Sequence, residues 1–184
     1  MSVAEFSGSS LRRSQTAVTK KEMKIRDATD ADLPAILAIY NQAVLTRIST
    51  AQLQPVSIEE RKDWIREHSA DHHPFWVAEI GGEIAAWLTV KPFIPRCAYE
   101  GTVELSVYVG EKFRRRGLAR QMLEEAIARA SSLGIIAMVG LIFGHNHPSL
   151  QLFEQLGFER WGLLPGVAQL DGVTRDLVIM GRHV

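Results

Sequence analysis

A short basic stretch between a strand-like segment and a helical pattern carries the clearest chemistry in the sequence. Residues 107–119 read VYVGEKFRRRGLA, so Lys112 and Arg114–Arg116 cluster beside Gly117, where a helical pattern begins. The first amides of a helix have no intrahelical acceptor, and the helix dipole adds positive potential there, so such an end binds phosphate. A glycine at position 117 would let an anion approach the backbone closely.

The cations in this stretch favour a polyanionic ligand over an ordinary surface turn. The helix dipole disfavours each cation at an N-terminus by about 0.3–1 kcal/mol. A solvated basic patch is the simpler alternative, and it would be the better interpretation if only two arginines were present. Several cations and a glycine after an apolar strand predict instead a phosphate site whose ligand neutralises them.

Residues 102–109, TVELSVYV, alternate strictly and contain a candidate general base. One face of this predicted strand carries Val103, Leu105, Val107 and Val109, and the other carries Glu104, Ser106 and Tyr108. A protonated amine needs a base before it can react, and a carboxylate that faces a cleft suits this role because desolvation disfavours its charged form. The alternation alone leaves a catalytic glutamate and a solvated or arginine-paired glutamate equally open.

The composition limits the classes of partner. The chain has 184 residues, 21 basic and 21 acidic, so zero net charge gives no global attraction to nucleic acid or to an anionic membrane. No apolar run approaches the ~20 residues that span a bilayer. The single cysteine, Cys97, excludes an intramolecular disulfide, and the expected location is cytoplasmic. His145 and His147 have no third ligand at a convincing spacing, so we expect no metal site.

The patterns predict one α/β domain over residues 24–184 after a disordered tail over residues 1–23. The expected order is one strand, two helices, three strands, a helix, a strand, a helix and two strands. The predicted ranges are strands 23–26, 75–80, 83–90, 102–109, 135–143, 158–164 and 173–180, and helices 29–45, 57–68, 116–133 and 148–156. Residues 91–101, with two prolines, are predicted to be a loop. This order makes a mixed α+β sheet flanked by helices.

Two motifs resemble the signatures of the GNAT superfamily of N-acetyltransferases. Arg114-x-x-Gly117-x-Ala119 matches its acyl-CoA pyrophosphate loop, and Asn146-x-x-Ser149, followed by Leu156-Gly157-Phe158, matches its second signature. Within the superfamily the chain is similar to the phosphinothricin and methionine sulfone/sulfoximine acetyltransferases. The supporting segments are Ile39-Tyr40-Asn41, Ala98-Tyr99, residues 102–109 and Asp176. The resemblance implies the GNAT fold, a mostly antiparallel mixed sheet with splayed central strands, and acetyl-CoA as co-substrate with no metal.

The resemblance also implies roles for particular residues. The diphosphate would be held by the loop residues Arg114, Arg115, Arg116, Gly117, Leu118 and Ala119, and the pantetheine arm by the backbone of Val107 and Val109. Asn146 and Ser149 would lie near that arm, although an asparagine that only caps the next helix is an equally good interpretation. Glu104 would be the base, and the amide of Val109 would stabilise the oxyanion. Many superfamily members have a tyrosine as general acid where this chain has Phe153, so the proton donor stays open.

The acceptor is less well defined by the sequence. Arg96, Tyr99 and Tyr108 are the substrate candidates, with Arg47 as a further candidate, although each arginine is also typical of an ordinary surface. Relatives often carry arginine where this chain has Glu100, which makes an amino-acid acceptor less certain. The expected acceptor is a small amine such as methionine sulfone, methionine sulfoximine or phosphinothricin. The alternatives are a protein or peptide N-acetyltransferase and a non-catalytic acyl-CoA sensor, and a homodimer is possible by resemblance.

Overall fold

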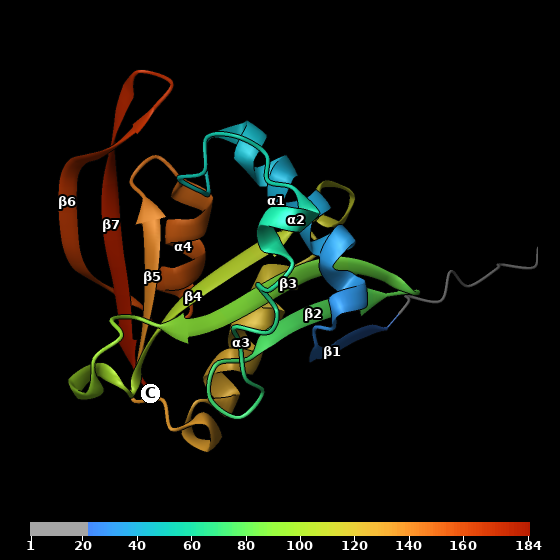
Figure 1. The fold of residues 1–184 in the computed structure, drawn as a ribbon. Coiled ribbons are helices and arrows are strands. Elements are labelled where there is room, and N and C mark those ends of the chain that lie inside the picture. Colours follow the sequence, from blue (N-terminus) through green and yellow to red (C-terminus); the bar gives the residue numbers. More distant parts are fainter. Residues whose placement is uncertain (1–21) are drawn as a thin grey trace, which may run out of the picture.

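A computed structural model describes residues 22–184, which form one seven-stranded mixed sheet with helices on both faces (Figure 1). The strand order is β1-β2-β3-β4-β5-β7-β6. The strands are β1 (Met23–Asp27), β2 (Phe75–Ile80), β3 (Glu83–Pro92), β4 (Thr102–Val109), β5 (Ala137–Phe143), β6 (Glu159–Leu170) and β7 (Val173–His183). The helices are α1 (Leu33–Thr46), α2 (Ile58–Arg61), α3 (Leu118–Arg129) and α4 (His147–Gln155), with short 3-10 turns η1 (Asp30–Asp32), η2 (Cys97–Tyr99), η3 (Glu111–Phe113) and η4 (Ser131–Leu133).

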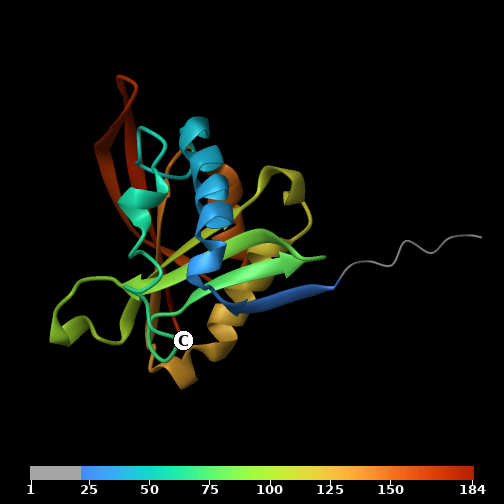
Figure 2. The ribbon, with the colours of Figure 1, turned by 45° about the vertical axis from the view of Figure 1, so that its right-hand side comes forward.

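The two faces of the sheet carry separate cores, because alternate residues of each strand point to opposite sides. The larger core packs α3 and α4 against one face, and its most deeply buried members include Trp76, Leu88, Met122, Leu123 and Met138. The smaller core packs α1 against the other face with Phe75, Val77 and Trp87. Figure 2 shows α1 in front of the sheet and α3 behind it.

The sheet opens in its middle. All neighbouring strands are antiparallel except β4 and β5, whose parallel pairing covers three residue pairs and ends at Glu104 opposite Val139. Beyond that point β4 stays with β3 up to Val109, and β5 stays with β7 up to Phe143. The strands therefore diverge over the second half of β4. The predicted GNAT fold with splayed central strands is confirmed.

The second helix is shorter than predicted. The capping box at Ser57 and Glu60 forms, but α2 ends at Arg61. After it the chain forms turns, in which the amide of Trp64 donates to the carbonyl of Arg61 and the amide of His68 to the carbonyl of Ile65. The ring of Trp64 packs edge-on against Trp87, which holds this segment on the sheet.

The predicted loop over residues 91–101 begins later than expected, because β3 continues through Lys91 to Pro92. The amide of Val90 donates to the carbonyl of Pro74, on the side of β2. Because backbone nitrogens alternate in direction along a strand, the nitrogen of Pro92 points to the same side, away from β4. The last residue of β3 paired with β2 is Thr89, so proline at position 92 interrupts no pairing.

The turns and the C-terminal strands follow the predicted order. Gly81 and Gly82 both have positive φ in the β2–β3 turn, as do Asp171 and Gly172 between β6 and β7. Strands β6 and β7 run longer than predicted, and β5 begins two residues later. The tail predicted over residues 1–23 lies largely outside the described residues, since the structure describes the chain from residue 22 and Met23 begins β1.

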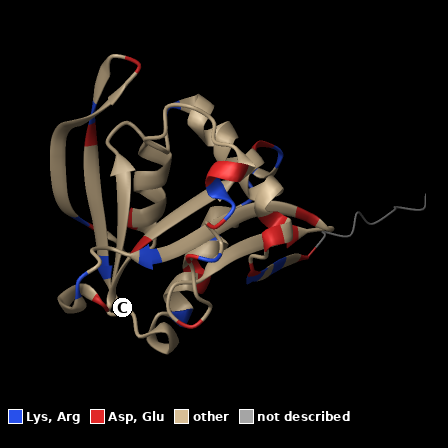
Figure 3. Cartoon of the chain, in the orientation of Figure 1, with Lys and Arg blue, Asp and Glu red and all other residues tan. Residues whose placement is uncertain are grey.

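Charged residues are spread over the molecule. In the view of Figure 3, basic and acidic segments are interleaved along helices and strands. Within residues 22–184, no helix combines the length and the apolar character needed to cross a membrane.

Candidate active site

The basic stretch forms an exposed loop between β4 and α3. Phe113 is buried and anchors the loop on the core, whereas Arg114, Arg115 and Arg116 are exposed. Gly117 is the N-cap of α3 with φ of 76°, a conformation that glycine adopts without strain. The first helical bond runs from the amide of Gln121 to the carbonyl of Gly117. The preceding amides of α3 thus have no intrahelical acceptor, and the helix has neither a side-chain cap nor an acidic residue in its first turn.

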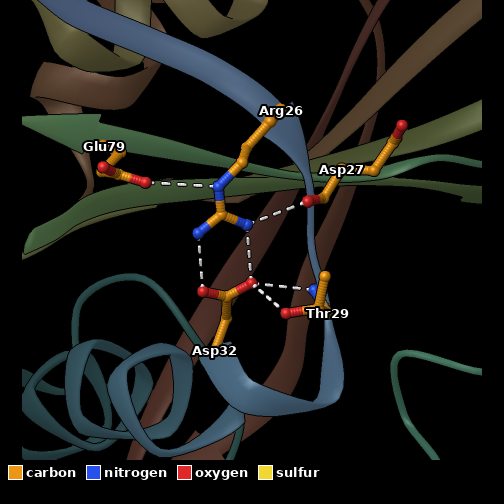
Figure 4. A network of polar contacts seen from close by, with 5 residues as sticks. All are labelled: Arg26, Asp27, Thr29, Asp32 and Glu79. Carbon is orange, nitrogen blue, oxygen red and sulfur yellow. Dashed lines mark hydrogen bonds and ion pairs between the residues drawn. The ribbon is translucent and has the colours of Figure 1, made fainter. Parts of the chain in front are cut away.

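The loop arginines differ from Arg26 on the edge strand β1, which is paired with carboxylates. Arg26 donates to both carboxylate oxygens of Asp32 at 2.7 and 2.8 Å and to Glu79 at 3.2 Å (Figure 4). This hydrogen bonding lowers the pKa of Asp32 to about 2. Arg114 and Arg115, by contrast, form no ion pair with any residue in the range 22–184. Their charge is therefore available to an anion at the N-terminus of α3.

A cavity of about 500 Å³ opens where β4 and β5 diverge. Its floor consists of three cross-strand pairs between β3 and β4: Lys91 with Glu104, Thr89 with Ser106, and Trp87 with Tyr108. The alternate residues of the same strands, including Leu88, Val90, Val103 and Leu105, belong to the larger core. The floor thus changes from a charged pair through a hydroxyl pair to an aromatic pair along the two strands.

The helix α1 and the segment that follows it cover the aromatic end of the cavity. Tyr108 donates a hydrogen bond from its hydroxyl to the carbonyl of Ser49 at 3.1 Å, and its ring lies 4.4 Å from that of Trp87. Burial raises the pKa of Tyr108, so its phenol stays protonated at neutral pH. Tyr40 shares a hydrogen bond with Thr50 at 2.8 Å, which fixes the same segment on α1.

The opposite wall is formed by β5 and α4. Leu141 and Phe143 line it from β5, and Asn146, Ser149 and Phe153 line it from α4. The side-chain oxygen of Asn146 accepts a hydrogen bond from the amide of Ser149 at 3.3 Å, so the asparagine caps α4 and also faces the cavity. Phe153 is buried against Gly140, where a Cβ atom would lie 2.4 Å from its ring. It carries no hydroxyl, so it cannot donate a proton.

The second half of β4 has backbone N–H groups that face the space where β5 has separated from it. Gly110 donates to the carbonyl of Ala85 on β3, and successive amides of a strand point in alternate directions. The N–H groups of Val107 and Val109 therefore point away from β3, towards the side where β5 has separated. Neither residue is paired with β5.

The structure brings only part of the predicted substrate set to the cavity. Tyr108 lines it, whereas Arg96 and Tyr99 lie on the exposed loop after β3 and do not. Arg47 is committed elsewhere: it ends α1 in a left-handed conformation and pairs with Asp171 at 2.7 Å. This pairing does not support its interpretation as a substrate ligand.

The sequence reasoning missed several lining residues. Tyr40, Arg61, Trp64 and Lys91 all line the cavity. The helical spacing that places Tyr40 on the inner face of α1 was the only available signal for these residues. Lys91 was assigned to the loop because Pro92 follows it. Nε2 of His145 donates a hydrogen bond to the carbonyl of Arg47 at 3.0 Å. Within residues 22–184 no three His, Cys, Asp or Glu side chains group closely enough to hold a metal ion.

The N-terminus of α3, which has no acidic residue in its first turn, and the parallel strands that separate fit what the resemblance to the GNAT superfamily implies. The chain belongs to the acetyltransferase (GNAT) family, whose model matches residues 37–158. It is accordingly an acetyl-CoA-dependent N-acetyltransferase.

Relatives and solved structures cover most of the chain. YwnH of Bacillus subtilis, provisionally named a phosphinothricin acetyltransferase, is 44% identical over 163 residues, 88% of this chain and 99% of the relative. An L-methionine sulfoximine/L-methionine sulfone acetyltransferase of Pseudomonas paraeruginosa is 39% identical over 157 residues, 85% of this chain and 91% of the relative. A phosphinothricin acetyltransferase from Sinorhizobium meliloti in complex with acetyl-CoA superposes with a TM-score of 0.83 at 30% identity, covering 88% of each chain.

Proposed function

We propose that this enzyme acetylates the amino group of a small amino acid or amino-acid analogue. The observation that carries the proposal is Glu104, the one carboxylate among the described residues that line a cavity of about 500 Å³, on the strand that leads into the predicted phosphate loop. The size of this cavity favours a small acceptor. The names of the relatives indicate methionine sulfone, methionine sulfoximine and phosphinothricin as the first acceptors to test.

In the proposed reaction Glu104 takes one proton from the acceptor ammonium. The neutral nitrogen then attacks the thioester carbonyl carbon, so that a C–N bond forms and the C–S bond breaks. The amide of Val109 is proposed to donate to the carbonyl oxygen as negative charge develops there. The attacking nitrogen becomes positively charged as it bonds, and it carries the proton that the leaving thiolate needs. This route requires no acid at the position of Phe153.

The proposed contacts with acetyl-CoA use backbone more than side chains. The amides at the start of α3 and the arginines at 114–116 would bind the diphosphate, and the free edge of β4 at Val107 and Val109 would pair with the pantetheine arm. Asn146 and Ser149 face the same space from α4. These assignments combine the geometry with the family resemblance.

The test is turnover. Purified protein, acetyl-CoA and each of the three compounds are mixed, and the release of free thiol is followed. We expect activity with at least one of them. Activity only with a peptide N-terminus or a lysine side chain would favour a protein N-acetyltransferase, and acetyl-CoA binding without turnover would favour a sensor module.

We further propose a homodimer in the cytoplasm, with a small-molecule amine as acceptor and no role for nucleic acid or a membrane. β6 is an edge strand, and its Trp161, Leu163, Leu164 and Val167 are each more than 40% exposed. An open, apolar edge of this kind favours pairing with a second chain. Light scattering after gel filtration would give the mass in solution, and a monomer at all concentrations would contradict the dimer.

A further inference from the structure

A lysine on β3 is paired with the carboxylate proposed as the base. Lys91 and Glu104 lie opposite each other in the β3–β4 register, with 3.0 Å between Nζ and Oε1. The glutamate side chain is 16% exposed and the lysine side chain 47% exposed. The carboxylate is therefore largely enclosed, while a ligand entering from solvent can reach the ammonium.

This pair accounts for most of the charge in the cavity. Among the described residues that line it, Glu104 is the single carboxylate, and Lys91 and Arg61 are the two cations. The guanidinium of Arg61 stands over the ring of Trp64, 5.2 Å from its centroid. The neighbouring His68 is held neutral, because burial lowers its pKa and the positive charge of Lys91 lowers it further. Lys91 is thus the cation in direct contact with Glu104.

The geometry points to Lys91 as the residue that binds the carboxylate of an α-amino acid acceptor, an inference that rests on the proposed function. An α-amino acid carries its ammonium and its carboxylate roughly 3 Å apart. Lys91 and Glu104 present the complementary charges on neighbouring strands. Placed head to tail on this pair, the acceptor sets its ammonium on Glu104 and its carboxylate on Lys91. One ion pair within the protein is exchanged for two charge-assisted contacts with the acceptor.

The exchange makes Lys91 a determinant of specificity. When the amine of the acceptor binds Glu104, Lys91 loses its ion pair with that residue. The carboxylate of an amino-acid acceptor gives Lys91 a new partner. An amine without a carboxylate separates the same pair and leaves the lysine without a partner, so it binds less well. The contact between Lys91 and the carboxylate of the acceptor also positions the acceptor, because it holds the acceptor nitrogen next to Glu104.

The test compares two acceptors in variants of one residue. Lys91→Met removes the charge and keeps an unbranched side chain, and Lys91→Arg keeps the charge. The acceptors are the best amino acid of the panel and the amine in which hydrogen replaces its carboxylate. With Lys91→Met we expect kcat/KM for the amino acid to fall about tenfold or more, mainly through KM, and kcat/KM for the amine to change less than about threefold. Lys91→Arg should restore most of the activity with the amino acid.

Lys24→Met is the matched control, because Lys24 is an exposed lysine on β1 that does not line the cavity. Melting temperature and acetyl-CoA affinity establish that each variant is folded. Equal losses with both acceptors would overturn the inference and leave Lys91 as a support for Glu104 alone. A wild-type enzyme that prefers the amine would overturn it too, while acetyl transfer stands. No turnover with any amine would contradict the proposed function itself, and the inference with it.

Discussion

The proposed phosphate loop and the proposed acceptor cavity use the same kinds of residue in opposite ways. In the loop, contiguous residues present exposed arginines and helix amides, and Arg114 and Arg115 have no acidic partner within the described chain. In the cavity, Lys91 and Glu104 come from two neighbouring strands and already neutralise each other. An anion site can therefore be built from local backbone geometry, whereas acceptor recognition depends on the register between distant segments.

The largest effect should come from a substitution that blocks the loop. Gly117→Glu places a carboxylate and a side chain where the diphosphate is proposed to bind, so we expect the Kd for acetyl-CoA to rise about a hundredfold or more. Calorimetry would measure it. Gly134→Glu is the matched control, since Gly134 has a similar φ of 70° and open space around it. Unchanged binding in Gly117→Glu would refute the phosphate-loop assignment.

The second effect should separate the cavity from the loop. Glu104→Gln keeps the shape of the side chain but removes its basicity, so we expect kcat to fall by about 10²–10³ while the Kd for acetyl-CoA stays unchanged. Glu154→Gln, an exposed glutamate on α4, is the control. Thiol release and calorimetry on the same preparations would provide both numbers. Full turnover in Glu104→Gln would remove this residue as the base.

A third substitution tests whether a paired arginine contributes only to stability. At neutral pH the lowered pKa of Asp32 corresponds to about 2 kcal/mol of folding free energy, which Asp32→Asn should remove. The stabilisation is present above the unfolded pKa, near 3.8, and is lost as pH falls towards about 2. Urea unfolding at pH 7 and pH 3 should thus show a smaller difference in the variant. Asp63→Asn, at an exposed ion pair, should change little. A loss of acetyl-CoA affinity in Asp32→Asn would break the contrast between the two kinds of arginine.

The smallest effect should come from single loop arginines. Arg115→Ala leaves the amides of α3 intact and removes one exposed charge, so we expect acetyl-CoA affinity to fall about fivefold, and less at high salt. Titrations at two ionic strengths would measure this. An effect as large as that of Gly117→Glu would mean that side-chain charge, rather than the helix end, holds the diphosphate.

The difference between local geometry and the register between strands also explains what the sequence could predict. The strand over residues 102–109 matched its predicted bounds because its apolar and polar residues alternate without interruption. The helix predicted over residues 116–133 is shorter, since α3 begins at Leu118 after Gly117 as its N-cap and ends at Arg129. The helix predicted to His68 failed because the packing of Trp64 on the sheet outweighs local helical spacing. Lys91 was missed because its proposed function depends on facing Glu104 across β3 and β4, and no local pattern encodes that register.

Alternation along β3 also has an evolutionary consequence. Trp87, Thr89 and Lys91 face the cavity, while Leu88 and Val90 between them are buried in the larger core. A mutation at Lys91 can therefore change the lining of the cavity and leave the larger core intact, whereas Trp87 also belongs to the smaller core. Enzymes that descend from one ancestor can therefore diverge in substrate range one residue at a time. The residues proposed to bind acetyl-CoA at the start of α3 stay the same.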